Sequence, residues 1–239
     1  MTTTSIPNTS NRAGATPQLA NLSPVAQLRA GRLPRRLTQL MIGLVIYGVS
    51  MAMMVRGTLG LDPWDVFHFG VASRLPLSFG GVVIVTSGAV LLLWIPLRQM
   101  PGFGTIANSI VIGLAADAAL AVIVEPSALA ARVSLLLGGV ALNALATALY
   151  IGSQFGPGPR DGLMIGLVRR TGWSVRVVRT SLELAAIAVG WLLGGIVGVG
   201  TIVYALAIGP LVQLLLPIFI VDLAPGDVIP SGCSSDQDV

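Results

Sequence analysis

The sequence predicts an all-α, polytopic membrane protein with about six transmembrane helices, built as two three-span inverted repeats. Composition is the first reason, because 54% of the 239 residues are hydrophobic and only 10% are charged, whereas about 25% are charged in a soluble domain. The second reason is a series of uncharged segments long enough to cross a bilayer. The third is a match between the two halves of the chain. The lipid bilayer is therefore the expected surrounding of this protein.

The basic residues indicate a membrane topology. All 14 are arginines, against 10 acidic residues, and such an excess also occurs in nucleic-acid-binding proteins. Here, however, eleven arginines fall in alternate loops and only three in the loops between them, which by the positive-inside rule puts both termini in the cytoplasm. We therefore expect no nucleic-acid partner. The eleven are Arg12, Arg29, Arg32, Arg35, Arg36, Arg98, Arg160, Arg169, Arg170, Arg176 and Arg179.

The two ends of the chain are polar. Residues 1–36 are rich in Ser, Thr, Asn and Pro and lack apolar periodicity, so we expect a disordered cytoplasmic arm. Residues 222–239 are expected to form a polar cytoplasmic tail, which holds the only cysteine, Cys233. Span one is the uncharged stretch 37–55 between Arg36 and Arg56. We expect Arg35 and Arg36 to anchor this span by charge alone, in which case lysine would serve equally well.

Further spans follow along the chain. Residues 75–97, 99–116 (running on to 124) and 133–151 give spans two, three and four. Residues 184–221 hold no charge, and a single helix of that length would measure about 57 Å against about 30 Å of hydrocarbon. This stretch must fold back, at the cluster of Gly194, Gly195, Gly198 and Gly200. The first membrane repeat then covers residues 37–124 and the second residues 132–221.

The two halves match when the sequence is shifted by 96 positions, which pairs residues 40–117 with 136–213 without a gap. The matched residues are mainly glycines, prolines, an acid and an arginine, whereas chance similarity between apolar segments would match Leu, Val and Ala. The duplication is therefore expected to be real. The most specific matches are Gly60, Pro63, Asp65 and Gly70 with Gly156, Pro159, Asp161 and Gly166, and Gly102-x-Gly104-Thr105 with Gly198-x-Gly200-Thr201.

Each repeat also contains a short segment, residues 63–74 in the first and 159–170 in the second. As a helix each would measure about 18 Å, too short to cross the hydrocarbon, so we expect two re-entrant or interfacial helices. With three crossings in each unit, the second copy lies in the membrane with the opposite orientation. In many transporters such segments at matching positions of inverted repeats mark the central site.

A family resemblance rests on the same blocks. Leu59-Gly60-x-x-Pro63-Trp64-Asp65-Val66-x-His68-x-Gly70, followed by Pro101-Gly102-x-Gly104-Thr105-x-x-Asn108, resembles the YczE/YyaS/YitT family of bacterial integral membrane proteins, closest to its YczE-like branch. The resemblance covers residues 37–221. It implies a multi-pass protein of the bacterial inner membrane, and it supplies no substrate and no catalytic residue.

The short segments supply the first candidate site residues. Asp65 and Asp161 stand two residues after Pro63 and Pro159, where an acid either binds a cation or proton inside the membrane or caps the first helical turn. The capping interpretation is favoured. His68, beside Trp64, lies on the same helix face as Asp65 and is either part of a proton relay or an interfacial polar residue. The latter is favoured, and one histidine predicts no metal site.

The Gly-x-Gly-Thr blocks are the second set of candidates. They lack the strand and the lysine of a nucleotide loop, so no cofactor is expected. We expect Gly60, Gly102, Gly104, Gly156, Gly198 and Gly200, with Pro63 and Pro159, to form structural turns. Thr105 and Thr201 would satisfy backbone groups at helix starts, and a role for them and Asn108 in lining a solute path is the second interpretation.

Other polar residues lie in or near the apolar spans, where such groups usually face a partner or a cavity. Asn143 is one of these. Glu183 has Arg179 four residues before it and is expected to pair with it. Asp117 has no partner at helical spacing and is either interfacial or functional.

The function most consistent with these features is a permease or transporter-like protein for a small solute or ion. The alternative is a non-transporting scaffold or accessory subunit, since glycine-rich spans also mediate helix association. A polar, water-reachable cavity between the short segments would favour transport, and a tightly packed centre would favour the scaffold. No constellation of catalytic residues can be assembled, so we do not expect an enzyme.

The arginine distribution predicts the outcome of a topology experiment. Reporter proteins fused after Arg36, Arg98 and Val221 should report a cytoplasmic location, and a fusion after Arg132 an external one. The reverse result at any two of these sites would contradict the predicted topology.

Overall fold

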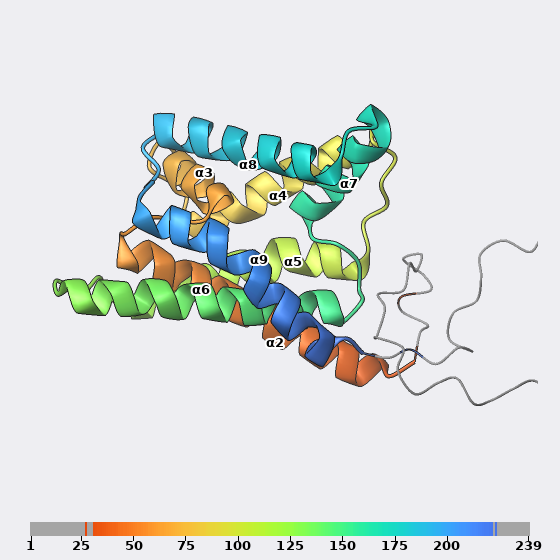
Figure 1. The fold of residues 1–239 in the computed structure, drawn as a ribbon, viewed down its shortest axis with the longest axis horizontal. Coiled ribbons are helices and arrows are strands. Elements are labelled where there is room, and N and C mark those ends of the chain that lie inside the picture. Colours follow the sequence, from red (N-terminus) through yellow and green to blue (C-terminus); the bar gives the residue numbers. More distant parts are fainter. Residues whose placement is uncertain (1–26, 28–30, 222, 224–239) are drawn as a thin grey trace, which may run out of the picture.

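The chain folds into helices throughout the part that the computed structural model describes, residues 27, 31–221 and 223. Figure 1 shows two groups of helices, with the short helices α3 and α7 in the same group as α4 and α8. Eight helices cover these residues: α2 (Leu33–Gly57), α3 (Pro63–Ala72), α4 (Phe79–Trp94), α5 (Phe103–Val122), α6 (Leu129–Gly152), α7 (Pro159–Thr171), α8 (Val175–Leu192) and α9 (Val199–Phe219).

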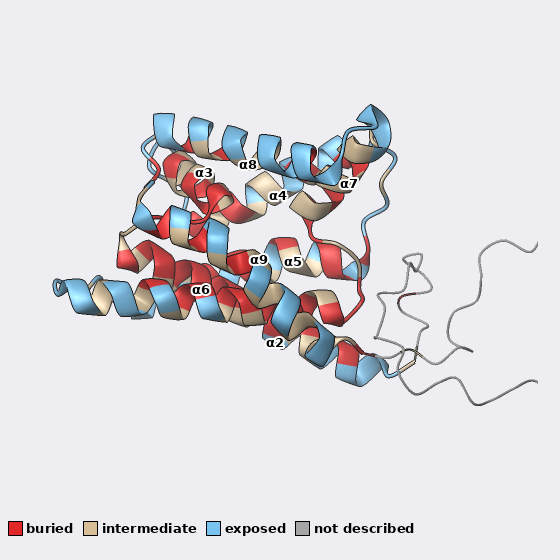
Figure 2. Ribbon diagram, viewed as in Figure 1, coloured by how far each residue is buried: buried red, intermediate tan, exposed pale blue. Residues whose placement is uncertain are grey.

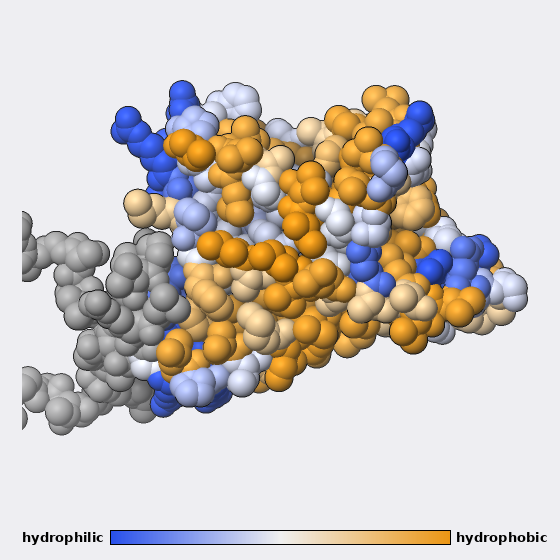
Figure 3. All heavy atoms as spheres, turned by 180° about the vertical axis from the view of Figure 1, so that it is seen from behind, coloured by the Kyte–Doolittle hydropathy of each residue, from blue (hydrophilic) through white to orange (hydrophobic). Residues whose placement is uncertain are grey.

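Four of the described helices, α2, α5, α6 and α9, are long and apolar enough to cross a membrane, and α4 is a shorter apolar helix. Large apolar side chains cover the outside of the bundle, among them Ile42, Leu114 and Leu206. Figure 3 shows this apolar surface between more polar ends. Such a surface is stable only in lipid. The prediction of an all-α, polytopic membrane protein is thus confirmed, while the expected arm 1–36 and tail 222–239 lie largely outside the described residues.

The fold-back within residues 184–221 occurs where the glycine cluster predicted it. Helix α8 ends at Leu192, α9 begins at Val199, and Gly194 between them has φ +103°, a conformation that favours glycine. Helix α8 begins at Val175, before the uncharged stretch that starts at Leu184. Ser174 starts this helix early by accepting a hydrogen bond from the Val177 amide.

Helix α2 is the centre of the packing, with α5 and α6 along two of its sides. Its buried residues include Leu40, Leu44 and Met51, and Figure 2 shows buried residues along this helix. Gly48 allows a close approach of α5, because a Cβ there would lie 2.6 Å from both the Ala115 Cβ and the Ile112 carbonyl oxygen. Small residues at such crossings let the backbones of membrane helices come together.

Helix starts in the two halves of the described chain are 96 residues apart at all four positions: 33 and 129, 63 and 159, 79 and 175, 103 and 199. The packing largely follows the same pairing, since α2 packs on α5 as α6 packs on α9, and α3 on α8 as α4 on α7. The clearest departure concerns α4 and α5. Helix α4 packs along α5, whereas α8 has no comparable contact with α9.

Arg36 corrects an expectation, because it is fully buried rather than anchored at a surface by charge. Its guanidinium donates hydrogen bonds to the carbonyl oxygens of Ser153 (2.9 Å), Gln27 (2.8 Å) and Gln154 (2.9 Å) and lies 4.4 Å from the centroid of the Phe155 ring. The planar, branched donor set fits these acceptors and an ammonium group does not. Arg36 thereby fixes the start of α2 to the segment that leads into α7.

Lysine should therefore fail at this position. Arg36→Lys leaves buried carbonyl groups without donors, and we expect a loss of about 1–3 kcal/mol of stability. The measurement is the melting temperature of the purified protein in detergent. Arg35→Lys is the matched control, because Arg35 is exposed and should melt like the wild type. Equal melting of both variants would contradict the guanidinium-specific role.

Candidate functional site

The loop before each short helix is held by the Gly-x-Gly-Thr block of the opposite half. The Gly200 amide donates to the Leu59 carbonyl (2.8 Å), and the Gly104 amide donates to the Phe155 carbonyl (3.0 Å). The adjoining Gly60 has φ +125°, and a Cβ there would lie 2.7 Å from the Thr201 amide nitrogen. The glycines therefore position the starts of α3 and α7 across the boundary between the halves.

The two threonines complete these turns. The Thr105 hydroxyl accepts from the Gly102 amide (3.1 Å) and donates to the Pro157 carbonyl (2.8 Å). The Thr201 hydroxyl accepts from the Gly198 amide (3.3 Å). Neither threonine lines a cavity described below, so their contacts are those of the first interpretation, the satisfaction of backbone groups at helix starts.

Asp62 begins helix α3, and sequence reasoning missed it. Its carboxylate accepts a hydrogen bond from the Asp65 amide (2.8 Å), which makes Asp62 the N-cap residue and Pro63 the first helical residue. The capping role that we favoured for Asp65 is therefore wrong in this helix. An Asp-Pro pair before a helix was the available signal, but Asp62 has glycine at the matching position 158 and so did not appear in the repeat.

Asp65 and His68 form a buried pair. The Nδ1 atom of His68 lies 3.2 Å from an Asp65 carboxylate oxygen, with the side chains 9% and 1% exposed. The second carboxylate oxygen of Asp65 has no hydrogen-bond partner. Trp64, Phe67 and Phe79 surround the imidazole at ring-centroid distances of 6.0–6.4 Å.

Arg160 connects the starts of the two short helices. It was expected in a cytoplasmic loop, but its Nη1 atom lies 3.8 Å from the Asp62 carboxylate, and its Nη2 atom donates to the Tyr47 hydroxyl. The guanidinium also faces the Tyr47 ring, 5.6 Å from the centroid. Desolvating a charge is costly unless it is paired, so Arg160 and the fully buried Asp62 stabilise each other at the junction of α3 and α7.

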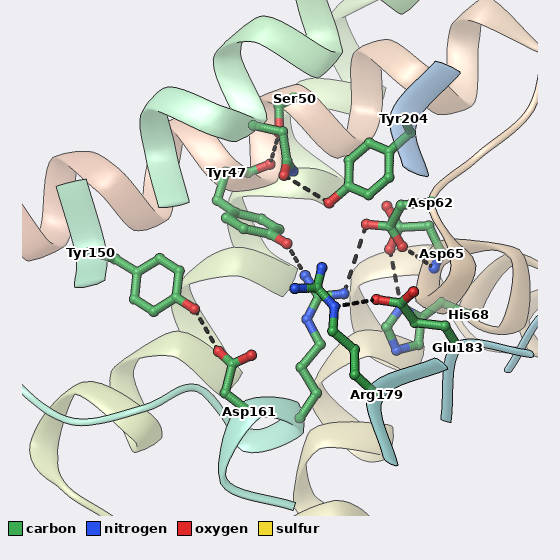
Figure 4. Close-up of polar contacts among 12 residues, drawn as sticks. Tyr47, Ser50, Asp62, Asp65, His68, Tyr150, Asp161, Arg179, Glu183 and Tyr204 are labelled. Atoms are coloured by element: carbon green, nitrogen blue, oxygen red, sulfur yellow. Dashed lines mark hydrogen bonds and ion pairs between the residues drawn. The ribbon is translucent and has the colours of Figure 1, made fainter. Parts of the chain in front are cut away.

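Further polar side chains approach this junction from other helices (Figure 4). Tyr150 on α6 donates to Asp161 at 2.7 Å, so Asp161 has a side-chain partner and does not act as the N-cap, which is Gly158. Arg179 pairs with Glu183 at 2.9 Å, as expected. The structure places seven of the eleven arginines in helices, with Arg35 and Arg36 in α2, Arg160, Arg169 and Arg170 in α7, and Arg176 and Arg179 in α8, whereas Arg12 and Arg29 lie outside the described residues.

Asn143 connects the core helices near this cluster. Its amide donates to the Ser50 hydroxyl (3.0 Å), and its carbonyl oxygen accepts from the Tyr204 hydroxyl (3.1 Å). This network joins α2, α6 and α9 and brings a tyrosine hydroxyl to the cavity described next.

A cavity of about 270 Å³ lies among these groups. The side chains of Arg160, Arg179 and Glu183 are 32%, 57% and 34% exposed, so the cavity reaches the outside. It lies toward the end of the bundle at which α6 ends and α8 begins, which is also the end at which α2 begins. Its charged lining residues are Asp62, Arg160, Asp161, Arg179 and Glu183.

A second, smaller cavity of about 50 Å³ is lined by Asp65, His68 and Asn108, among others. Tyr47, Trp64 and Arg160 line both cavities and therefore separate them. Of the sequence-predicted candidates, Trp64 and Asp161 reach the large cavity and Trp64, Asp65, His68 and Asn108 the small one. Sequence reasoning missed Tyr47, Asp62, Tyr150 and Arg160, because most of their partners come from distant helices.

Asp117 lies apart from the large cavity and joins α5 to α4. Its carboxylate accepts hydrogen bonds from the Ser78 hydroxyl and, at 2.7 Å, from the Gly80 amide. Four unpaired amides lie at every helix start, and Asp117 satisfies one of them from a neighbouring helix. Sequence spacing gave no sign of this contact, because its partners are 37 and 39 residues away.

Comparison with known proteins gives a consistent result. Residues 34–217 match the model of a family of unknown function, DUF6198. An uncharacterized protein of Haemophilus influenzae is 40% identical over 179 residues, which are 75% of this chain and 82% of that protein. The uncharacterized membrane protein YczE of Bacillus subtilis is 31% identical over 178 residues, 73% of this chain and 82% of YczE. No solved structure shows a significant match.

A more distant relative, the uncharacterized protein YyaS of Bacillus subtilis, is 23% identical over 181 residues, 74% of this chain and 90% of YyaS. The name of the membrane protein YczE and the apolar helices of this chain agree on a multi-pass membrane protein. The chain therefore belongs to the DUF6198 family, within the YczE/YyaS group of membrane proteins.

Proposed function

We propose that this protein is a permease for a small polar solute and that the 270 Å³ cavity is its solute site. One observation carries the proposal: charged side chains from both halves line an outward-reaching cavity where two short helices meet. Ionisable residues inside a membrane protein are costly and usually mark a substrate or ion path. A scaffold needs no such cavity, whereas a permease does.

The arrangement of the helices supports the same proposal. We infer six crossings, by α2, α4, α5, α6, α8 and α9, as two inverted three-span repeats with α3 and α7 as the short elements. The common spacing of 96 residues between helix starts supports the duplication. The arginines at the start of α2, at the end of α7 and at the start of α8, together with Arg98, support cytoplasmic termini in the bacterial inner membrane. In this topology the large cavity faces the cytoplasm.

The lining favours a solute with both signs of charge. Arg160 and Arg179 offer guanidinium groups, while Asp161 and Glu183 offer carboxylates and Tyr150 a hydroxyl group. A single ion would meet opposing charge on one wall of the cavity, whereas a zwitterion can pair with both. The volume of about 270 Å³ is slightly below the usual range of about 300–1,000 Å³ for ligand sites, which favours a small solute.

The direct test is solute flux in vesicles that contain the purified protein. We expect saturable uptake of at least one small zwitterion, such as an amino acid or a betaine, and little uptake of alkali cations or dicarboxylates. Empty vesicles give the background. The absence of uptake above background for all of these solutes would reject the permease and favour the scaffold.

Variants of Arg160 can separate its structural role from its role in solute binding. Arg160→Gln leaves the buried Asp62 carboxylate without its cation and should cost about 1–3 kcal/mol of stability. Adding Asp62→Asn removes the unpaired charge and should restore the melting temperature. Flux should remain lost in the double variant, because the solute still lacks the guanidinium.

Arg169→Gln is the matched control, since Arg169 is an exposed arginine near the end of the same helix. It should retain both stability and flux. Recovery of flux together with stability in the double variant would make Arg160 purely structural.

A further inference from the structure

The two cavities occupy equivalent positions in the two halves. Asp65, His68 and Ser87 line the small cavity, and the residues 96 positions later, Asp161, Met164 and Glu183, line the large one. The small cavity is therefore a contracted counterpart of the large cavity rather than an unrelated packing defect. Arg160 and Trp64 are themselves an equivalent pair, and both line both cavities.

The helix packing explains why the small cavity has a smaller volume than the large one. A Cβ on Gly80 would overlap the Gly113 carbonyl, so α4 and α5 are in backbone contact there. Asp117 stabilises this contact by accepting hydrogen bonds from the Ser78 hydroxyl and the Gly80 amide. We call the Gly80–Gly113 contact with its Asp117 hydrogen bonds the α4–α5 clasp.

The other half has no such clasp. The residues equivalent to Gly80, Gly113 and Asp117 are Arg176, Gly209 and Gln213. A Cβ added to Gly209 would have no neighbouring atom within 4 Å. Both Gly209 and Gln213 line the large cavity. The space between α8 and α9 is thus open where that between α4 and α5 is closed.

We propose that the small cavity is the far half of a single solute pathway and opens when the α4–α5 clasp parts while α8 closes onto α9. This inference rests on the proposed permease function and assigns a second solute site around Asp65. A solute held at Arg160 need not travel far, because that side chain already faces both cavities. Exchange of two equivalent conformations between inverted repeats is a known way to alternate access.

Asp65 is the residue that binds the solute in the far cavity. It is fully buried and lines that cavity, and one of its carboxylate oxygens has no hydrogen-bond partner. An unsatisfied buried acceptor is costly and is relieved when a donor arrives. The cationic group of the solute is that donor, and the charged or titratable side chains around it are His68, Asp62 and Arg160.

Cysteine labelling from each side of the membrane tests whether the two cavities open alternately. In a Cys233→Ser background, Thr86→Cys reports on the small cavity and Leu182→Cys, at the equivalent position, on the large one. Each is treated with a membrane-impermeant maleimide in vesicles of known orientation. We expect Leu182→Cys to react from the side of the termini and Thr86→Cys to react only slowly, from the opposite side.

Loosening the clasp should change the two rates in opposite directions. With Asp117→Ala, labelling of Thr86→Cys should accelerate about ten- to a hundredfold, the effect of losing hydrogen bonds to a charged group, while labelling of Leu182→Cys slows. Acceleration at both sites would indicate general loosening and would overturn the proposal, as would unchanged rates. The melting temperature of each variant identifies one that has simply lost its fold.

A cross-link separates this inference from the proposed function. Ser78→Cys combined with Asp117→Cys, joined by mercuric ion, should abolish flux, and a thiol reductant should restore it. Ser78→Cys alone, treated in the same way, is the control. Flux that survives the cross-link would leave the permease intact and reject the far cavity. Wild-type protein without any flux would instead reject the permease, and the labelling would still decide whether the far cavity opens.

Discussion

The ion pair between Arg160 and Asp62 is the constraint on which the rest of the structure depends. These residues begin the two short helices, and the 3.8 Å between their charged atoms joins α7 to α3. Neither charge is stable alone in an apolar bundle, so the pair requires both loops to be placed correctly. The Gly-x-Gly-Thr blocks provide that placement by binding the Leu59 and Phe155 carbonyls across the boundary between the halves. Geometry at the boundary thus determines where a polar cavity can form.

Unequal packing of equivalent helices gives this cavity its opening. Glycines at positions 80 and 113 let α4 lie against α5, while Arg176 replaces the first of them in the second half. An arginine side chain cannot fit where two backbones touch, and α8 stands away from α9. The chain therefore presents one open and one contracted cavity at equivalent positions. Under the proposed inverted-repeat topology, this asymmetry is what alternating access requires.

Much of the fold was predictable because it rests on local constraints. Uncharged segments located the apolar helices, and the glycine cluster located the turn at Gly194. The site was predicted only in part, because Arg160 and Arg179 looked like loop residues beside Arg169 and Arg170. Their carboxylate and hydroxyl partners, apart from Glu183, lie on other helices. Arg36 was misjudged for the same reason, since its carbonyl acceptors at Ser153 and Gln154 are more than 110 residues away. Sequence spacing does not reveal contacts of that kind.

The most direct measurement is a pair of spin-label distances in the Cys233→Ser protein. One pair is Leu184 with Leu206, across α8 and α9, and the other is Gly88 with Ile110, at the equivalent positions across α4 and α5. All four residues are exposed, so labels should not disturb the core. The account predicts two populations for each pair, with the α8–α9 distance shortening as the α4–α5 distance lengthens when a transported zwitterion is added. Two fixed distances, or distances that change in the same direction, would contradict it.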